Sequence, residues 1–432
     1  MPAFAQFIFW AIVVLALLLY VAWLSSRYYF AERFPDEIHF TRTEDGWRIA
    51  LSRYRPEAPC NAEPVVLCHG IGANRRNLDL TDELSLAGYL AARGYDVWLI
   101  ELRGRGFSAR PRLFSRFRWD WCFDEYVDQD IPAGLEVVRR VTGADTVHWV
   151  GFSTGGMAMY AYLSDPRRSM SVRSAVAIAA PGSFKRQRQY LSGRLIRHAR
   201  WLRHALLLRV LAPLAGYWHP APIHIIHNPE NLDGRTLRLA MVNVVVNFSR
   251  NELLQFSDWI MNDAFRSIDR RRDYRAELQR IETPMLFLAG PRDLIAPPDM
   301  VKTVFDAVGS KDKKFVICSR PGGFKVNYGH IDLVLGRNAP EEIYPLVRDW
   351  LDAHAREEII RPADERPPPV QVAARRRPGS DEEQHDITTT YRDLGAGVAT
   401  AGPSPPTAEA SVEAAPGASP APGSASAEGK AP

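Results

Sequence analysis

A serine, an aspartate and a histidine stand at positions of this chain where they could form a catalytic triad. Ser153 lies in the pattern Gly-Phe-Ser-Thr-Gly, Asp293 follows the apolar segment 285–289, and His330 follows the apolar segment 315–318 and a glycine-rich loop. In such a triad the serine attacks a carbonyl carbon, the histidine takes the serine proton, and the aspartate holds the imidazole tautomer. The types and the order of these residues predict acyl-transfer chemistry on an ester.

The residues around Ser153 predict a nucleophile elbow, which is a strand, a sharp turn and a helix with the serine at the apex. Gly151 and Gly155 flank the serine. We expect a Cβ atom at either position to collide with the neighbouring strand or helix. Gly-X-Ser-X-Gly arises easily by chance in a chain with 29 glycines. An ordinary glycine-rich turn between a strand and a helix is therefore the alternative.

A second glycine-rich loop follows the apolar segment 63–68 and begins with His69 and Gly70. Such a loop at the carboxyl end of a strand lets backbone N–H groups approach a ligand closely. We expect an oxyanion hole formed by the backbone N–H groups of Ile71 and Thr154, with His69 as a residue that packs the loop. A dinucleotide-binding fingerprint is the competing interpretation, but its third glycine is missing.

Other acids and histidines compete for these roles. Asp299 and Asp306 fall in a predicted helix, and Asp332 follows His330 by two residues, so we favour Asp293 as the acid.

His148 lies inside the predicted elbow strand. A buried and hydrogen-bonded side chain is expected there. His224 and His227 are three residues apart, but only His219 offers a third metal ligand nearby. The four cysteines show no metal-ligand spacing. We therefore expect no metal and no cofactor.

The elements that must position these residues alternate between strands and helices. A hairpin with an Asp-Gly turn is predicted over 38–43 and 47–54. Further strands are predicted at 63–68, 95–101, 147–150, 172–179, 285–289 and 315–318, and a helix at 124–141. Continuous apolar runs of this kind are typical of strands buried on both faces of a parallel sheet. The pattern predicts an α/β fold with a mostly parallel central sheet and helices on both faces.

The predicted domains follow from this pattern. Residues 36–182 and 283–356 form the α/β core, and residues 183–282 form a helical cap or lid insert. The first part of the insert, 185–211, holds eight basic residues and no acidic residue, interleaved with leucines. A basic amphipathic helix on an anionic membrane surface has this composition, and so does the solvated face of a cap helix. Both interpretations remain open.

The chain begins with an apolar segment, 4–24, of about 21 residues that carry no charge. This length suffices to cross a hydrocarbon layer of about 30 Å. A cleaved signal peptide is the alternative, but basic residues before the segment and a clean cleavage site after it are missing. Arg27 and Arg33 follow the segment, so the positive-inside rule places the large domain on the cytoplasmic side. We expect a single-pass N-terminal membrane anchor.

The composition excludes few classes of protein. Hydrophobic residues make up 46% of the 432 residues and charged residues make up 24%. Both shares are ordinary for globular proteins. The net charge of +4 is too small to indicate nucleic-acid binding, and no obligate protein partner is evident. From about residue 361 the chain is rich in Pro, Ala, Ser and Gly, so we expect 361–432 to be a disordered tail.

With these motifs placed, the region from Phe40 to Asp352 resembles the α/β-hydrolase superfamily, in particular its acid lipase and polyester synthase/depolymerase branch. The segments that carry the resemblance are TRTEDGWRIALSRY, LCHGIGANRRNLD, GYDVWLIELRGRGFS, FDEYVDQDIPAGLE, GFSTGG and NYGHIDLVLG. The resemblance implies a triad of Ser153, Asp293 and His330. It also implies an oxyanion hole at Ile71 and Thr154. Polyester synthases of this branch carry cysteine in the elbow, so a serine there favours hydrolysis.

The sequence thus predicts a membrane-anchored serine hydrolase acting on carboxylic esters with a hydrophobic acyl or alcohol part. The expected partners are the hydrophobic ester substrate and the lipid surface. An acyltransferase would use the same triad with an alcohol in place of water, and a non-catalytic scaffold of the same fold is the third hypothesis.

Overall fold

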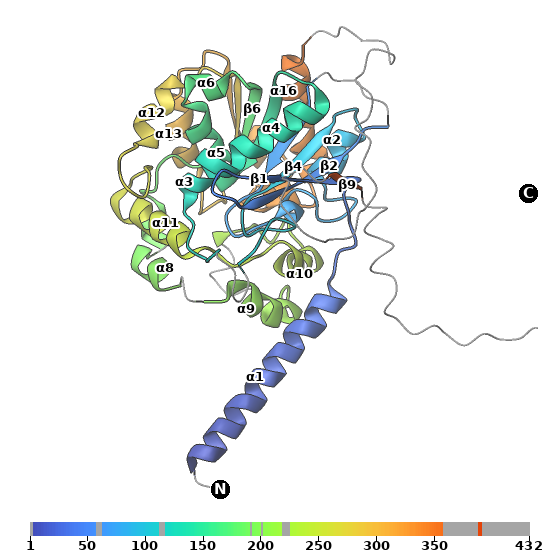
Figure 1. Cartoon of the computed structure of the whole chain (residues 1–432), viewed down its shortest axis with the longest axis vertical. Helices are drawn as coiled ribbons and strands as arrows, with labels where there is room; N and C mark the ends of the chain where they lie inside the picture. The colour runs from blue at the N-terminus through green and yellow to red at the C-terminus, as the bar shows by residue number, and fades with distance from the viewer. Residues whose placement is uncertain are drawn as a thin grey trace, which may run out of the picture. The chain divides into compact units, whose positions relative to one another are not determined.

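The computed structural model describes residues 3–57, 63–111, 117–190, 192–199, 202–217, 225–356 and 388–390. Almost all of the tail predicted to be disordered lies outside these residues, and so do His219 and His224. The described part is built around one sheet (Figure 1).

The sheet has the strand order β8-β7-β6-β5-β3-β4-β2-β1-β9. Its strands are β1 (Glu37–Arg42), β2 (Arg48–Tyr54), β3 (Val65–Cys68), β4 (Val97–Glu101), β5 (Val147–Phe152), β6 (Val172–Ile178), β7 (Met285–Ala289), β8 (Lys313–Ile317) and the short edge strand β9 (Thr388–Thr390). The six strands from β8 to β4 pair in parallel, whereas β2, β1 and β9 pair antiparallel. This confirms the predicted α/β fold with a mostly parallel sheet.

The inner parallel strands are apolar because both of their faces are covered. Every residue of β3, β4, β5 and β7 is buried. Helices pack along the sheet (Figure 1), namely α2 (Leu86–Ala91), α4 (Ile131–Thr142), α5 (Thr154–Leu163), α13 (Pro298–Ala307) and α16 (Tyr344–His354). Shorter helices are α6 (Pro166–Ser169), α14 (Asp332–Leu335) and α15 (Ala339–Glu342).

The helix predicted at 124–141 is divided by one wide turn. It begins as α3 (Phe123–Glu125), continues as a π-helical turn at Tyr126–Asp130, and becomes α4. Pro132 is the second residue of α4. Proline has no N–H to donate to the preceding turn, and the Val127 carbonyl of the π turn accepts from Arg168 Nη1 at 3.2 Å. The π turn buries the side chains of Tyr126 and Asp130.

The chain between β6 and β7 is mainly helical. Its helices are α7 (Gln187–Tyr190), α8 (Gly193–Ala199), α9 (His204–Leu211), α10 (Gly234–Asn243), α11 (Arg250–Asn262) and α12 (Tyr274–Glu277). Helix α8 packs on α11, where Ser257 Oγ donates to the Gly193 carbonyl at 2.7 Å. A buried ion pair between Arg105 and Glu252, 2.7 Å long, joins α11 to the loop after β4. The insert is therefore held to the sheet by polar contacts as well as by apolar packing.

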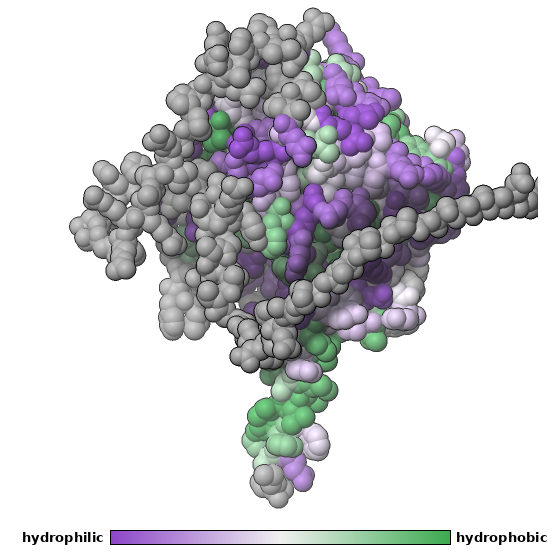
Figure 2. Space-filling model, turned by 90° about the vertical axis from the view of Figure 1, so that its right-hand side faces the viewer, coloured by the Kyte–Doolittle hydropathy of each residue, from purple (hydrophilic) through white to green (hydrophobic). Residues whose placement is uncertain are grey.

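The N-terminal segment forms one helix, α1 (Ala3–Tyr28), long and apolar enough to cross a membrane. Figure 2 shows its hydrophobic side chains exposed along its length. Its C-terminal end packs against α9. Just beyond the helix, Asn243 of α10 accepts from the Ala31 N–H at 3.1 Å and donates to the Tyr29 carbonyl at 2.7 Å. Length and composition suit a membrane anchor and also a signal sequence.

Candidate active site

Ser153 stands at the apex of the turn between β5 and α5. Its backbone has φ 51° and ψ −118°. This conformation is unfavourable for a residue with a side chain. The Ser153 N–H donates to the Ile178 carbonyl of β6 at 2.8 Å, so the adjacent strand holds the strained residue in place. The turn therefore places the Ser153 hydroxyl at the carboxyl end of β5. Only 5% of Ser153 is exposed.

The two flanking glycines are required by close backbone approach. A Cβ atom on Gly151 would lie 2.5 Å from the Gly156 nitrogen, and one on Gly155 would lie 2.4 Å from the Cys68 carbonyl oxygen. Both obstacles are backbone atoms, which cannot rotate away as a side chain can. Glycine at these positions lets α5 start close to β3, as the sequence pattern predicts.

The structure brings His330 and Asp293 to Ser153. His330 Nε2 lies 3.0 Å from Ser153 Oγ, and His330 Nδ1 lies 2.7 Å from Asp293 Oδ2. A carboxylate only accepts, so the Nδ1–H donates to Asp293. Nε2 is then left to accept from the Ser153 hydroxyl. This arrangement can remove the serine proton.

Asp293 is fixed by the loop that follows β7. Its Oδ1 accepts from the N–H groups of Ile295 at 2.8 Å and Ala296 at 2.7 Å, and the residue is fully buried. The Arg292 N–H donates to the Tyr328 carbonyl at 2.9 Å, which ties this loop to the histidine loop. The acid and the base are thus positioned by backbone contacts rather than by side-chain packing alone.

The competing acids lie elsewhere. Asp299 and Asp306 stand on α13 with side chains more than half exposed. Asp332 is buried, but its carboxylate accepts from the N–H groups of Gly329 at 2.9 Å and Asn228 at 3.1 Å. Asp332 therefore holds the loop that carries His330. Sequence reasoning missed this role, because Asn228 lies about a hundred residues away in the chain.

The predicted oxyanion donors lie beside the elbow. Thr154 is the first residue of α5. Its N–H therefore has no acceptor within the helix. Ile71 follows Gly70, where a Cβ atom would lie 3.2 Å from Ser153 Cβ. The Gly70 N–H donates to Asn77 Oδ1 at 3.1 Å, a loop contact that the sequence did not reveal.

His69 and His148 are buried and neutral. His69 Nδ1 donates to the Gly70 carbonyl at 2.9 Å while its Nε2 accepts from the Leu102 N–H at 3.4 Å, and burial lowers its pKa to about 3. His148 Nδ1 lies 2.9 Å from Ser174 Oγ, and burial lowers its pKa to about 3 as well. Both pack the interior, as expected from their places in the sequence. Within the described ranges no three metal-binding side chains cluster.

Two buried arginines of the loop after β4 connect that loop to distant segments of the chain. Arg103 donates to Asp130 at 2.8 Å and also pairs with Asp45 in the hairpin turn, and Arg105 pairs with Glu252. Burial raises the pKa of Asp130 to about 6, although Arg103 opposes the rise. These partners were not predicted, since no local pattern links residues so far apart in the chain.

The chain is similar to several lipases. Lipase lipl-1 of Caenorhabditis elegans is 32% identical over 165 residues, which are 35% of this chain and 40% of that protein. The probable lipase C16A3.12c of Schizosaccharomyces pombe is 24% identical over 355 residues, 74% of this chain and 77% of that protein. Human gastric triacylglycerol lipase is 30% identical over 162 residues, 35% of this chain and 41% of that protein.

The matches to the worm and human proteins span about two fifths of the length of each relative. They agree with the predicted resemblance to acid lipases. The family described as alpha/beta hydrolase fold matches residues 63–317, more than half of this chain. Together with the parallel sheet and the strained turn at Ser153, this match shows that the chain belongs to the α/β-hydrolase fold family.

Proposed function

We propose that this protein is a membrane-anchored serine hydrolase that cleaves carboxylic esters of hydrophobic, lipid-like substrates. The observation that carries the proposal is the continuous hydrogen-bonded chain from Ser153 Oγ through His330 to Asp293 Oδ2, with distances of 3.0 and 2.7 Å. Hydrogen-bonded groups of these three types activate a serine hydroxyl for attack on an acyl group.

In the first half of the reaction, Ser153 Oγ attacks the carbonyl carbon of the ester while His330 Nε2 takes the hydroxyl proton. The tetrahedral intermediate collapses when the bond to the leaving alcohol breaks, and His330 gives its proton to that alcohol. Asp293 stabilises the positive imidazolium during these steps, held in place by its two backbone N–H donors. An acyl group remains on Ser153.

In the second half, His330 removes a proton from water, and the resulting nucleophile attacks the acyl-enzyme. The bond between Ser153 Oγ and the acyl carbon breaks, the serine regains its proton from His330, and a carboxylic acid leaves. The N–H groups of Ile71 and Thr154 would donate to the negative oxygen in both halves. Removing one such donor typically costs about 3 kcal/mol of transition-state stabilisation.

Three observations support a lipid-like substrate at a membrane. The relatives named above are lipases, α1 is long and apolar enough to span a bilayer, and helices between β6 and β7 contact the rest of the chain, α10 at Arg75–Asn77 and α12 at α5. We propose α1 as an uncleaved anchor and the insert as a cap over the substrate pocket. Arg27 and Arg33 after the apolar segment favour a cytoplasmic catalytic domain.

The proposal is tested by replacing Ser153 with alanine in the full-length chain. We expect p-nitrophenyl ester turnover to fall at least a thousandfold without a change in melting temperature, because alanine removes the nucleophile and little volume. Turnover close to that of the wild type would contradict the proposal. Adding an acceptor alcohol and analysing the products separates hydrolysis, which yields free acid, from acyl transfer, which yields a new ester.

A further inference from the structure

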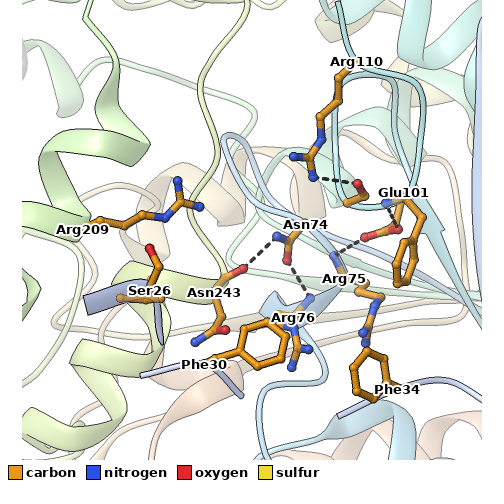
Figure 3. Close-up of a pocket in the computed structure, with 13 residues that line it drawn as sticks. Ser26, Phe30, Phe34, Asn74, Arg75, Arg76, Glu101, Arg110, Arg209 and Asn243 are labelled. Carbon is orange, nitrogen blue, oxygen red and sulfur yellow. Dashed lines mark hydrogen bonds between the residues drawn. The ribbon is translucent and has the colours of Figure 1, made fainter. Parts of the chain in front are cut away.

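A cavity of about 360 Å³ lies where the end of α1 meets the cap and the catalytic core (Figure 3). Ser26, Phe30 and Phe34 reach it from the N-terminal segment, and Arg209 reaches it from α9. The end of β4 and the loops after β3 and β4 supply Asn74, Arg75, Arg76, Glu101, Gly106, Phe107 and Arg110, and the end of α10 supplies Val242 and Asn243. Neither Ser153 nor His330 lines it. It is therefore separate from the active site described above.

The wall of the cavity is strongly basic. Arg75, Arg76, Arg110 and Arg209 face a single acid, Glu101, among the described residues that line it. Glu101 is itself held by backbone groups, since its carboxylate accepts from the N–H groups of Arg75 at 3.3 Å and Phe107 at 2.6 Å. An excess of positive charge remains.

Arg75 is neutralised, but the other three arginines are not. Arg75 Nη1 pairs with Asp79 at 2.9 Å. Within the part of the chain that the structure describes, Arg76, Arg110 and Arg209 form no ion pair with a carboxylate. Arg110 donates to the Gly106 carbonyl, a neutral acceptor, at 2.6 Å. Uncompensated guanidinium groups that share one cavity repel one another.

Of these three arginines, Arg76 gives the strongest evidence for a bound anion, because it is buried and its Nη1 atom lacks an acceptor among the described residues. Only 7% of it is exposed, and no described group accepts a hydrogen bond from its buried Nη1 atom. Its guanidinium lies over the ring of Phe30, 5.4 Å from the centroid. Burial and the neighbouring Arg75 lower the pKa of Arg76 to about 10. Burying a charged donor without an acceptor destabilises the folded chain. A bound anion that accepts from Arg76 would remove this free-energy cost.

We propose that this cavity binds the phosphate of an anionic lipid headgroup through Arg76, Arg110 and Arg209. Guanidinium groups match phosphate oxygens in geometry and charge, and they retain their charge at any physiological pH. The position of the cavity at the end of α1 favours a lipid, because residues just beyond a spanning helix lie at headgroup level. This last step rests on the proposed anchoring role of α1.

Phe30 and Phe34 suit the same occupant. Both line the cavity and are still 52% and 38% exposed, so glycerol and acyl carbons next to a bound headgroup would contact them. Aromatic side chains favour the membrane interface. A free phosphate ion would use the arginines in the same way but would gain nothing from these rings. The two sources of phosphate can therefore be separated by experiment.

The test uses the full-length chain in an uncharged detergent. It is titrated with a soluble short-chain diether phosphatidic acid, the matched diether phosphatidylcholine and inorganic phosphate. The ether lipids contain no carboxylic ester, so the result does not depend on the proposed hydrolase activity. We expect the phosphatidic acid to bind at least tenfold more tightly than either of the other two probes.

Two variants and a control locate the site. Arg76→Gln and Arg209→Gln should each weaken binding of the phosphatidic acid about tenfold, because each removes a charge that has no carboxylate partner among the described residues. Arg209 is only partly buried on α9, so this variant tests the site even if Arg76→Gln does not fold. Arg167→Gln on α6 removes an arginine whose side chain is 91% exposed and should leave binding unchanged.

Several results would overturn the proposal. Equal binding of the two lipids would show that the net charge of the headgroup does not affect binding. Inorganic phosphate binding as tightly as the lipid would assign the cavity to a free ion. If the wild-type chain binds none of the probes, the cavity is not a phosphate site. If the two variants bind the phosphatidic acid as tightly as the wild type does, the lipid binds elsewhere.

Discussion

The Asp293→Asn variant tests the hydrogen-bond chain because the structure fixes which way the new amide must point. Asp293 Oδ1 accepts from the N–H groups of Ile295 and Ala296, and its Oδ2 accepts from His330 Nδ1. Asparagine keeps one oxygen and replaces the other with an NH2 group, which only donates. Pointing the NH2 at the two backbone donors would break two buried hydrogen bonds, at about 1–3 kcal/mol each. The asparagine oxygen must therefore stay with the backbone.

The NH2 group of the variant then faces His330 and donates to Nδ1. His330 must carry its proton on Nε2, so it donates to Ser153 and can no longer accept the serine proton. The equivalent change in another serine hydrolase costs about 10⁴ in kcat through the wrong tautomer. We expect a loss of that order in kcat for a p-nitrophenyl ester. The stability should change by less than about 1 kcal/mol, because both backbone hydrogen bonds survive.

The matched control is Asp299→Asn on α13, which makes the same chemical change in a carboxylate that is 56% exposed and pairs with Arg186. We expect both its activity and its melting temperature to match those of the wild type, because exposed ion pairs contribute little. If Asp293→Asn keeps kcat within tenfold of the wild type while folding normally, the tautomer argument is wrong. If it unfolds, the proposed orientation of the amide is wrong instead.

Two further predictions concern the elbow and the buried histidines. Gly155→Ala places a Cβ atom 2.4 Å from the Cys68 carbonyl oxygen. It should therefore cost at least about 1–3 kcal/mol of stability and most of the ester turnover. Gly143 has a left-handed backbone, with φ +71°, and open space where a Cβ would stand. Gly143→Ala should cost about 1–2 kcal/mol of stability and keep turnover, and equal turnover in the two variants would refute the steric argument. Burial lowers the pKa of His148 to about 3. Below about pH 6.5 the His148 imidazole is therefore protonated in the unfolded chain but not in the folded chain. The free energy of unfolding falls as pH falls, because protons bind preferentially to the unfolded state. His148→Asn should reduce this fall, measured in urea titrations from about pH 6.5 to 5, by about 0.7 kcal/mol per pH unit at pH 6.5, rising to about 1.4 kcal/mol per pH unit near pH 5. An unchanged slope would contradict the prediction.

The features that could be predicted from the sequence are those whose physical cause is local. The elbow needs Gly151 and Gly155 beside the serine, and the parallel strands need continuous apolar runs, so both leave a readable pattern. The order of Ser153, Asp293 and His330 could be used in the same way, because each follows a strand that ends at the same edge of the sheet.

The features that could not be predicted depend on partners far apart in the chain. Glu252 neutralises Arg105 across 147 residues, and Asp332 anchors the histidine loop through Asn228 across 104 residues. No local period marks such pairs, since only the folded chain brings them together. The same holds for the cavity at the end of α1, where the unpaired charge of Arg76 emerges only once its neighbours are known.

The central claim is that Ser153 is a nucleophile activated by His330. It is tested most directly by treating the full-length protein with a fluorophosphonate probe and mapping the modified residue by peptide mass spectrometry. We predict a single phosphonylated serine at position 153, formed rapidly in the wild type and at least a hundredfold more slowly in His330→Ala. A folded wild-type chain whose Ser153 stays unmodified, or labels equally fast without the imidazole, would contradict the account.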